Sequence, residues 1–182
     1  MKVESTSKYV ARLALTLLLI TAVVAVVLAG VNTITAPRIA AINEQKTQAA
    51  IEAVLPGGGA EIPFTDDSGL VVTVYQGDNG YAVEVAPAGF GGVVDMMVGV
   101  DPEGNVLGIS IISQTETAGL GAVAAASTSA GEAFRDQFVG MNGTIAVAKD
   151  GGTVDAITGA TITSRSVCTG VNAALACVAN FQ

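Results

Sequence analysis

Residues 155–164, Asp-Ala-Ile-Thr-Gly-Ala-Thr-Ile-Thr-Ser, have the residue types and spacing to bind a phosphate group. They join a strand-like run to a helical one. Gly159 and Ala160 leave room for a phosphate to approach the backbone, and Thr163 or Ser164 could cap the following helix. The first N–H groups of that helix are free donors at the positive end of its dipole. The segment is not a P-loop, because the Gly-Lys-Ser/Thr signature with its phosphate-binding lysine is missing.

Two scarce residue types limit the other chemistry that the chain could perform. There is no histidine, which excludes His-ligated haem, the usual His-containing zinc sites and any Ser-His or Cys-His catalytic pair from this chain. Cys168 and Cys177 lie in a helical pattern, on opposite faces at about 100° per residue, which disfavours a disulfide between them. Two thiols also fall short of the ligand set of a typical iron–sulfur cluster. We therefore expect both cysteines to pack in the core.

The elements that must position these residues follow from the hydrophobic pattern. A last helix is expected from about Ser164 to Val178, and its apolar stripe indicates packing against a sheet, with its N-terminus at the Thr-Gly-Ala-Thr turn. The other expected elements are strands at 70–75, 81–85, 93–100, 106–112, 144–148 and 154–157, and a short helix at 132–138. The first four strands form two hairpins joined by Gly- and Asn-containing turns.

A loop at residues 114–121, Gln-Thr-Glu-Thr-Ala-Gly-Leu-Gly, follows the second hairpin. Its two glycines beside polar residues are typical of a loop that another group approaches closely. The chain lacks both the strand–helix alternation and the Gly-x-Gly-x-x-Gly fingerprint of a doubly wound nucleotide-binding fold. The sequence therefore predicts an α+β domain of antiparallel β-hairpins packed with helices.

The apolar segment 13–36 is long enough to span a bilayer. It holds 24 residues without a charge, and as a helix it would measure about 36 Å at about 1.5 Å per residue. Three basic residues precede it and one acidic residue opposes them: Lys2, Lys8, Arg12 and Glu4. The positive-inside rule then places residues 1–12 in the cytoplasm and the rest of the chain on the outer face of the cell (inner) membrane.

A cleaved signal peptide is the main alternative to this anchor, since it also has a basic start, an apolar run and a small-residue stretch. The apolar run is long for a signal peptide, and Val31 stands where a lipoprotein would need cysteine. We expect a retained single-pass anchor. Residues 37–56 then form an amphipathic stalk helix, which Pro56 and the glycines after it end, and residues 57–182 form the extracytoplasmic domain.

The charge of the segment after the anchor excludes one class of partner. Residues 38–182 carry five basic residues against fifteen acidic ones. An acidic surface is repelled by nucleic-acid phosphates and by anionic lipid headgroups. Nucleic acid is therefore not an expected partner, and the anchor rather than the domain surface must hold the protein at the membrane.

Taken together, three motifs resemble the FMN-binding domain of the G subunit of the Rnf complex, the membrane ferredoxin:NAD oxidoreductase, and of the related C subunit of the sodium-pumping NADH:quinone oxidoreductase. Residues 155–163 resemble the flavinylation motif of that family, residues 116–121 resemble its Glu-Thr-Pro-Gly-Leu-Gly loop with Ala118 in place of proline, and residues 89–91 match its Gly-aromatic-Gly start. The resemblance covers about residues 85–178, and the single N-terminal span fits it as well.

The resemblance implies that FMN is bound covalently, as a phosphoester on Thr161. The threonine hydroxyl is a weak nucleophile and no histidine is present to activate it. The resemblance implies that a separate flavin transferase, using FAD and a divalent metal, makes this bond. The resulting phosphodiester keeps one negative charge, which the N-terminus of the following helix would stabilise by about 0.3–1 kcal/mol. Arg165 could assist there or could be a surface residue.

Other residues of the two motifs receive candidate roles from the same resemblance. The candidate cofactor-binding residues beside Thr161 are Asp155, Thr158, Gly159, Ala160, Thr163, Ser164, Glu116, Thr117, Leu120 and Gly121. Asp155 either helps the transferase hold its metal or fixes the turn. Glu116 and Thr117 either bond the flavin ring or ribityl chain or close the loop, and Leu120 is expected to cover part of the ring. No catalytic residue and no resident metal are expected.

The expected function is that of an electron-carrying subunit in a membrane-bound Rnf-type complex, an oxidoreductase that couples electron transfer between ferredoxin and NAD to translocation of Na⁺ or H⁺. Its expected partners are the other subunits of that complex, the membrane, and the flavin transferase during maturation. Two alternatives stay open from the sequence: a C-type subunit of the quinone reductase or another anchored flavoprotein, and a non-redox extracytoplasmic binding module.

Overall fold

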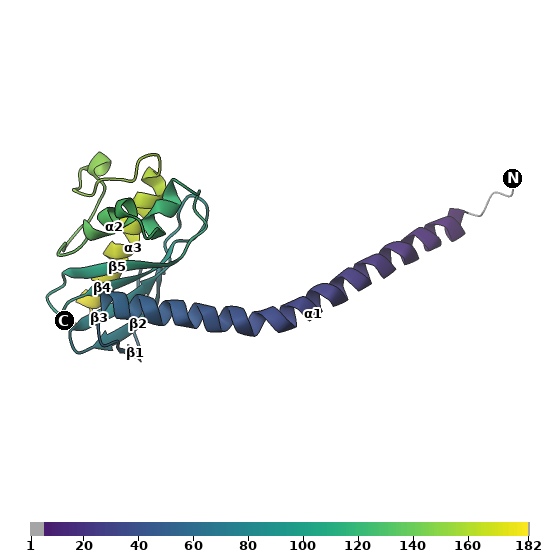
Figure 1. The fold of residues 1–182 in the computed structure, drawn as a ribbon, viewed down its shortest axis with the longest axis horizontal. Coiled ribbons are helices and arrows are strands. Elements are labelled where there is room, and N and C mark those ends of the chain that lie inside the picture. Colours follow the sequence, from purple (N-terminus) through teal and green to yellow (C-terminus); the bar gives the residue numbers. More distant parts are fainter. Residues whose placement is uncertain (1–5, 182) are drawn as a thin grey trace. The chain divides into compact units, whose positions relative to one another are not determined.

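The computed structural model describes residues 6–181, so Lys2 and Glu4, used above to orient the anchor, lie outside the described residues. The chain divides into two compact units, one ending at Glu44 and one beginning at Gln45. Both units share the long first helix, α1 (Thr6–Val54), which Figure 1 shows as a single unbroken coil. The two units are described in turn.

The first unit consists of α1 up to Glu44. The helix runs through Pro37 without interruption, so the predicted anchor and stalk are parts of one helix. Its most apolar stretch has no buried residue and is long and apolar enough to cross a membrane. Leu15, Leu17 and Val26 are among its side chains that are more than 60% exposed. An apolar helix of this length with exposed side chains fits a membrane anchor.

The second unit is built on a five-stranded antiparallel sheet in which each strand pairs with the next along the chain. The strands are β1 (Ala60–Ile62), β2 (Val71–Gly77), β3 (Gly80–Val85), β4 (Asp95–Val100) and β5 (Val106–Ser113). The two predicted hairpins are β2–β3 and β4–β5, and β3 also pairs with β4. Only the short edge strand β1, paired with β2, was absent from the prediction. The predicted α+β class is confirmed.

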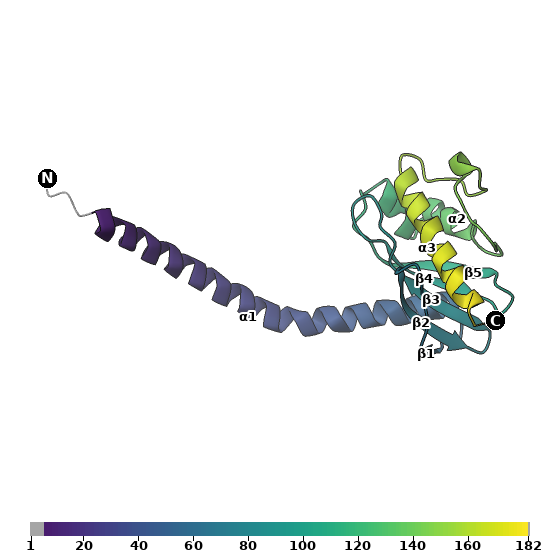
Figure 2. The same cartoon turned by 180° about the vertical axis from the view of Figure 1, so that it is seen from behind.

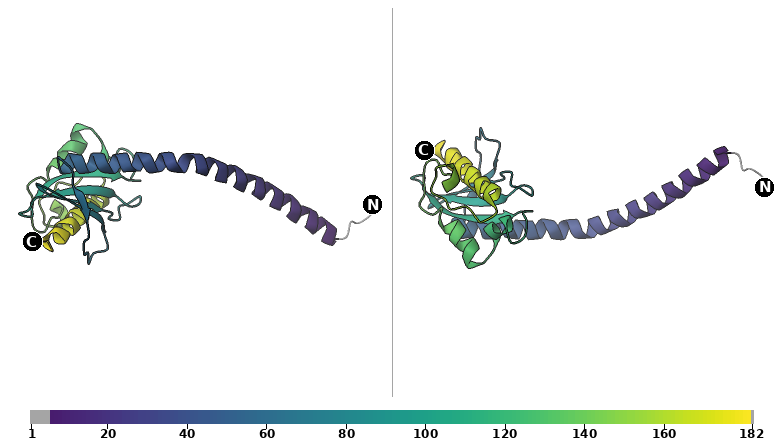
Figure 3. Two further views of the ribbon diagram at one scale, coloured as in Figure 1. Left: turned by 90° about the horizontal axis from the view of Figure 1, so that it is seen from below. Right: turned by 90° about the horizontal axis from the view of Figure 1, so that it is seen from above.

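Alternating side chains give the sheet two buried faces. One face of β3 and β4 packs beneath α3 (Thr161–Ala179), and it contributes Val83, Val85, Met96 and Val98. The opposite face contributes Ala82 and Met97, which pack against the last turns of α1. The approach is close at Gly99, where a Cβ would lie 2.9 Å from the Cβ of Val54. Figure 2 shows α3 lying across the sheet, and both views of Figure 3 place the sheet between α3 and the end of α1.

Shorter elements complete the unit and correct the predicted boundaries. The short helix α2 (Ser129–Asp136) starts before the predicted 132–138, because the Thr128 side chain caps it by accepting a hydrogen bond from Gly131 N. The strands predicted at 144–148 and 154–157 are wrong: only one isolated bridge joins Val147 to Val154. Between them lies the 3₁₀ turn η2 (Ala148–Asp150); another, η1 (Gly121–Ala125), follows β5.

The cysteines lie in the core, as the sequence predicts. Cys168 and Cys177 are free and buried in α3. Burial raises the pKa of the Cys168 thiol from 9.0 to about 11 and also raises the pKa of Cys177. Both thiols are therefore protonated at neutral pH and act as small apolar side chains.

Candidate functional site

The phosphate-binding segment forms a tight turn that leads directly into α3. Ala160 N donates to Ile157 O over 2.9 Å and closes a β-turn whose third residue, Gly159, has φ +77°. Glycine is the residue that adopts this conformation without strain, and a Cβ here would also lie 3.0 Å from Leu120 Cδ2. The turn therefore needs Gly159 for both its conformation and its closeness to Leu120.

Helix α3 begins at Thr161, earlier than the predicted Ser164, and Ala160 is its N-cap without a side-chain cap. The capping roles predicted for Thr163 and Ser164 are therefore wrong. The Ser164 hydroxyl instead holds the preceding turn, accepting from Ile157 N and donating to Ala160 O, each over 3.0 Å. Since no side chain caps the helix, its first N–H groups keep their capacity to bind an anion.

Thr161 places its hydroxyl at the start of this helix, beside a lysine from another segment. Lys149 Nζ lies 3.5 Å from Thr161 Oγ1. Thr161 is partly buried and Lys149 is exposed. A hydroxyl is thus presented at a helix N-terminus with an ammonium group at its side, a setting that favours negative charge.

An ion pair fixes the backbone next to that lysine. Arg165, in the first turns of α3, donates from Nε to Asp150 Oδ2 over 2.6 Å and from Nη2 to Asp150 Oδ1 over 2.7 Å. Its hydrogen bonds hold the pKa of Asp150 below its ordinary value of 3.8. Arg165, considered above as a possible phosphate partner, is therefore paired with Asp150.

Glu116 joins three segments that are distant in the sequence. Glu116 is 8% exposed, and its carboxylate accepts from Gly91 N over 2.8 Å and from the Thr163 hydroxyl by a short hydrogen bond. Gly121 packs so closely that a Cβ there would lie 2.6 Å from Glu116 Oε2. The carboxylate therefore ties the Gly89–Gly92 turn and the loop after β5 to the first turn of α3.

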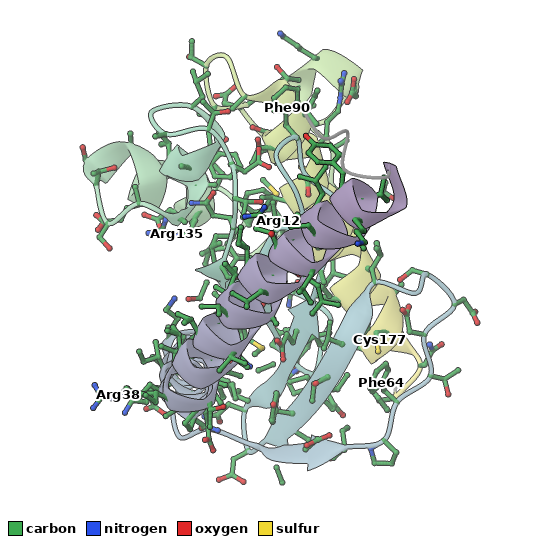
Figure 4. All side chains as sticks on the ribbon, turned by 90° about the vertical axis from the view of Figure 1, so that its right-hand side faces the viewer. Arg12, Arg38, Phe64, Phe90, Arg135 and Cys177 are labelled. Atoms are coloured by element: carbon green, nitrogen blue, oxygen red, sulfur yellow. The ribbon has the colours of Figure 1, made fainter. Side chains whose placement is uncertain are left out.

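These segments enclose a cavity of about 370 Å³, which is within the size range of small-molecule and cofactor sites. It is lined by Phe90, Glu116, Thr117, Leu120, Gly121, Lys149, Gly159, Ala160, Thr161, Ile162 and Thr163. The apolar side chains at its mouth are well exposed: Phe90 69%, Ile162 49% and Leu120 41%. Figure 4 shows Phe90 near one end of α3, with Cys177 and Phe64 near the other. The cavity thus has a polar end at Thr161 and an apolar rim.

Eight of the eleven residues predicted for the site line this cavity; Asp155, Thr158 and Ser164 do not. Ser164 is fully buried beneath the turn. Asp155 and Thr158 are exposed and line a second cavity of about 380 Å³, beside Gly119 and α2. Gln137 fixes the Asp155 backbone there, accepting from its N–H over 2.7 Å and donating to its carbonyl over 3.2 Å.

Three lining residues were missed as site residues: Phe90, Lys149 and Ile162. Phe90 was noted only as part of the Gly-aromatic-Gly motif, although an aromatic residue between glycines is itself a signal of a contact residue. Ile162 was visible inside the motif. Lys149 falls between the strands predicted at 144–148 and 154–157. Its position depends on the contact between Asp150 and Arg165, which the sequence pattern does not reveal.

The cavity can hold an elongated ligand with an anionic end and a planar apolar end. Lys149 and the N-terminus of α3 suit the anion, and the side chains of Phe90, Leu120 and Ile162 suit an aromatic ring. The Thr161 hydroxyl lies at this anionic end, 3.5 Å from Lys149 Nζ.

Two family models match the chain. Residues 89–176, which contain every residue that lines the cavity, match the FMN-binding domain. Residues 1–54, which end with α1, match the RnfG N-terminal region. The first match therefore falls on the domain that contains the cavity, and the second falls on the long helix.

Curated relatives resemble the chain over most of its length. The G subunit of the Na(+)-translocating ferredoxin:NAD(+) oxidoreductase complex of Acetobacterium woodii is 34% identical over 204 residues, covering 100% of this chain and 97% of that protein. The G subunit of the ion-translocating oxidoreductase complex of Methanosarcina acetivorans is 30% identical, covering 94% of this chain and 95% of that protein. The proton-translocating counterpart from Clostridium ljungdahlii is 39% identical over 105 residues, 56% of this chain and 54% of that protein.

Proposed function

Because the chain belongs to the family of G subunits of Rnf-type ion-translocating ferredoxin:NAD oxidoreductase complexes, we propose that it is an electron-carrying subunit with FMN esterified to Thr161. The chain contains an FMN-binding domain. Its relatives are named as G subunits and its helix matches the RnfG N-terminal region, which favours an Rnf-type complex over the C subunit of the quinone reductase.

The observation that carries the proposal is the position of the Thr161 hydroxyl. It lies at the first residue of α3, in the cavity and 3.5 Å from Lys149 Nζ. A phosphate at Thr161 Oγ1 would meet the first N–H groups of the helix and the ammonium group. The flavin ring would be received by Phe90, Leu120 and Ile162 at the mouth of the same cavity. The residues present therefore fit FMN at both of its ends.

The chain itself offers no base to activate Thr161. It contains no histidine, and both oxygens of Glu116, the acidic residue that lines the cavity, already accept hydrogen bonds. A separate transferase with FAD and a divalent metal supplies the attachment chemistry. The Thr161 Oγ1–phosphorus bond forms, the bond from that phosphorus to the AMP phosphate breaks, AMP leaves, and the hydroxyl proton passes to the transferase.

The bound flavin supplies the redox chemistry, while the protein supplies attachment and orientation. The second cavity places Asp155 and Thr158 on the accessible side of the turn, where the transferase could contact them. Glu116 holds the Gly89–Gly92 turn, and with it Phe90, at the cavity. Covalent attachment prevents loss of the cofactor outside the cytoplasm.

Helix α1 anchors the domain in the cell membrane, with residues 1–12 in the cytoplasm, 13–36 in the bilayer and the FMN-binding domain outside. Its exposed apolar surface and the absence of charge between Leu13 and Ala36 support this arrangement. Lys8 and Arg12 precede the apolar stretch, in the position that the positive-inside rule assigns to the cytoplasm.

The full-length protein made together with a flavin transferase tests the attachment. We expect a band that keeps flavin fluorescence after denaturing electrophoresis, and complete loss of this fluorescence in Thr161→Ala. Thr169→Ala is the matched control, since it removes an exposed hydroxyl from the same helix outside the motif. A dark wild-type band, or a fluorescent Thr161→Ala band, would refute the proposal.

A further inference from the structure

We infer that Lys149 is the cation that pairs with the phosphate on Thr161, and that the ion pair between Asp150 and Arg165 holds it in place. The inference rests on the proposed attachment of FMN to Thr161. It assigns a binding role to a residue outside the Thr-Gly-Ala-Thr motif, and a positioning role to the ion pair next to it.

The charges around the cavity support Lys149 as the partner of the phosphate. Among the described residues that line the cavity, Lys149 is the one with a positive charge, and its Nζ lies 3.5 Å from Thr161 Oγ1. The negative charge of Glu116 is directed to Gly91 N and to the Thr163 hydroxyl. A phosphate ester on Oγ1 would therefore carry its charge within reach of the ammonium group.

The backbone of Lys149 is held by its neighbours. Lys149 lies in the 3₁₀ turn η2, which Gly151 ends in the left-handed conformation with φ +86°. The next residue, Asp150, forms two hydrogen bonds with Arg165 in the first turns of α3. The turn that carries Lys149 is thus fastened to the helix that carries Thr161. This restricts the flexible lysine side chain to the neighbourhood of the hydroxyl, which lowers the entropy lost when it pairs with a phosphate.

The overall charge of the domain makes a local cation important. Residues 38–182 carry fifteen acidic and five basic side chains, so the surface repels FAD and FMN phosphates on average. Arg165 is already paired with Asp150. Lys149 therefore offsets this repulsion at the one point where the phosphate must approach.

The first experiment measures the rate of flavin attachment to the full-length protein by a purified transferase with FAD and Mg²⁺. At low ionic strength Lys149→Gln should slow attachment about three- to fivefold, the range expected for one exposed charge pair. Lys149→Arg, which keeps the charge, should restore most of the rate. The difference should shrink as salt is added. Lys46→Gln, an exposed lysine on α1, is the control and should leave the rate unchanged.

The second experiment tests the positioning role of the ion pair. Arg165→Gln should slow attachment less than Lys149→Gln does, and the double variant should be no slower than Lys149→Gln alone, because the pair acts through the lysine. Additive losses would instead mean that Arg165 contacts the phosphate independently, and would overturn the positioning role.

A third measurement examines the protein after flavin attachment and does not depend on the attachment rate. The ³¹P resonance of the phosphodiester should move in Lys149→Gln and stay in place in Lys46→Gln. Slower attachment with an unmoved ³¹P resonance would mean that Lys149 contacts the transferase, and would overturn the inference. Attachment at the wild-type rate in Lys149→Gln would overturn it as well.

These outcomes separate the inference from the function on which it rests. If the wild type acquires covalent flavin and Thr161→Ala does not, the proposed function stands. The attachment rates and ³¹P resonances of the Lys149 variants then test only the inference. If the wild type acquires none, the proposed function and the inference fall together. The melting temperature of each Lys149 and Lys46 variant should stay close to that of the wild type, as expected for surface substitutions.

Discussion

The two ends of α3 differ in polarity and in exposure. At its N-terminal end, Thr161 and Thr163 face a cavity, and Ile162 is half exposed. At its C-terminal end, Cys177 and Val178 are buried, and Phe181, just beyond the helix, stacks on Tyr81 with ring centroids 5.4 Å apart. One helix thus combines an open polar end with a closed apolar end. We expect changes at the first to alter flavin attachment and changes at the second to alter stability.

The largest expected effect comes from a charge placed in the closed half. Val171 is fully buried against the sheet, so Val171→Asp should lower the free energy of unfolding by about 4 kcal/mol or more, because the carboxylate gains no partner. Ala176 is exposed in the same half, and Ala176→Asp should be nearly neutral. Denaturant titrations of both variants measure the difference, and equal stabilities would contradict the assignment of this half to the core.

The buried thiols of Cys168, near the middle of α3, and Cys177, near its C-terminal end, provide a second measure of how closed this part of the helix is. Burial raises the pKa of Cys168 from 9.0 to about 11. At pH 8 the thiolate fraction in the folded protein should therefore be about a hundredth of that in the unfolded chain. Alkylation with iodoacetamide should be correspondingly slow, and should become fast in guanidinium chloride. Rapid alkylation of the native protein would show that the packing of α3 around its thiols opens.

The next effect belongs to the open end. The Thr163 hydroxyl donates to the buried Glu116 carboxylate, and Thr163→Val removes this hydrogen bond. We expect a loss of about 2 kcal/mol in the free energy of unfolding, because a buried charged acceptor loses a partner. Flavin attachment should slow as well, since the loop and the helix are less firmly joined.

Ser166 is the matched control for Thr163. It lies in the same helix and is 4% exposed, but its hydroxyl has no hydrogen-bond partner among the residues that the structure describes. Ser166→Ala should therefore be neutral or slightly stabilising. A similar loss in the free energy of unfolding in both variants would show that the hydrogen bond to Glu116 makes no specific contribution to stability.

The smallest effect is a pH dependence at the open end. Hydrogen bonds from Arg165 lower the pKa of Asp150 below 3.8 in the folded protein. The unfolded chain therefore binds this proton first as the pH falls. The ion pair contributes stability above the unfolded pKa, and this contribution is lost as the pH falls through the folded pKa. Asp150→Asn should reduce the acid dependence of the melting temperature between about pH 5 and 2. An unchanged slope would argue against the pair.

Much of the fold was predictable because its signals are local. The hairpins follow from alternating apolar residues between Gly- and Asn-containing turns, and the match is close for β3 and β5. The strands predicted on either side of Lys149 failed because residues 146–154 fold back on themselves as a tight loop. A Cβ at Gly152 would collide with the backbone of Ala146, so the chain crosses itself closely instead of forming a ladder.

The candidate site was predictable to the extent that it lies within motifs. The Glu116–Gly121 loop and the turn before α3 were both identified, and they line one cavity. The start of α3 was predicted three residues too late because Thr161 and Thr163 have low helix propensity. The Ser164 hydroxyl lies inside the helix and stabilises the preceding turn. Lys149 was missed because its place beside Thr161 depends on an ion pair fifteen residues apart in the sequence.

Mass spectrometry of the flavin-carrying peptide tests the central claim most directly. Trypsin cleavage after Lys149 and Arg165 yields the peptide 150–165, which contains five hydroxyl-bearing residues: Thr153, Thr158, Thr161, Thr163 and Ser164. After maturation with a flavin transferase, we predict one FMN on this peptide, with the fragment ions placing it on Thr161. An unmodified peptide, or FMN on any of the other four hydroxyls, would contradict the claim.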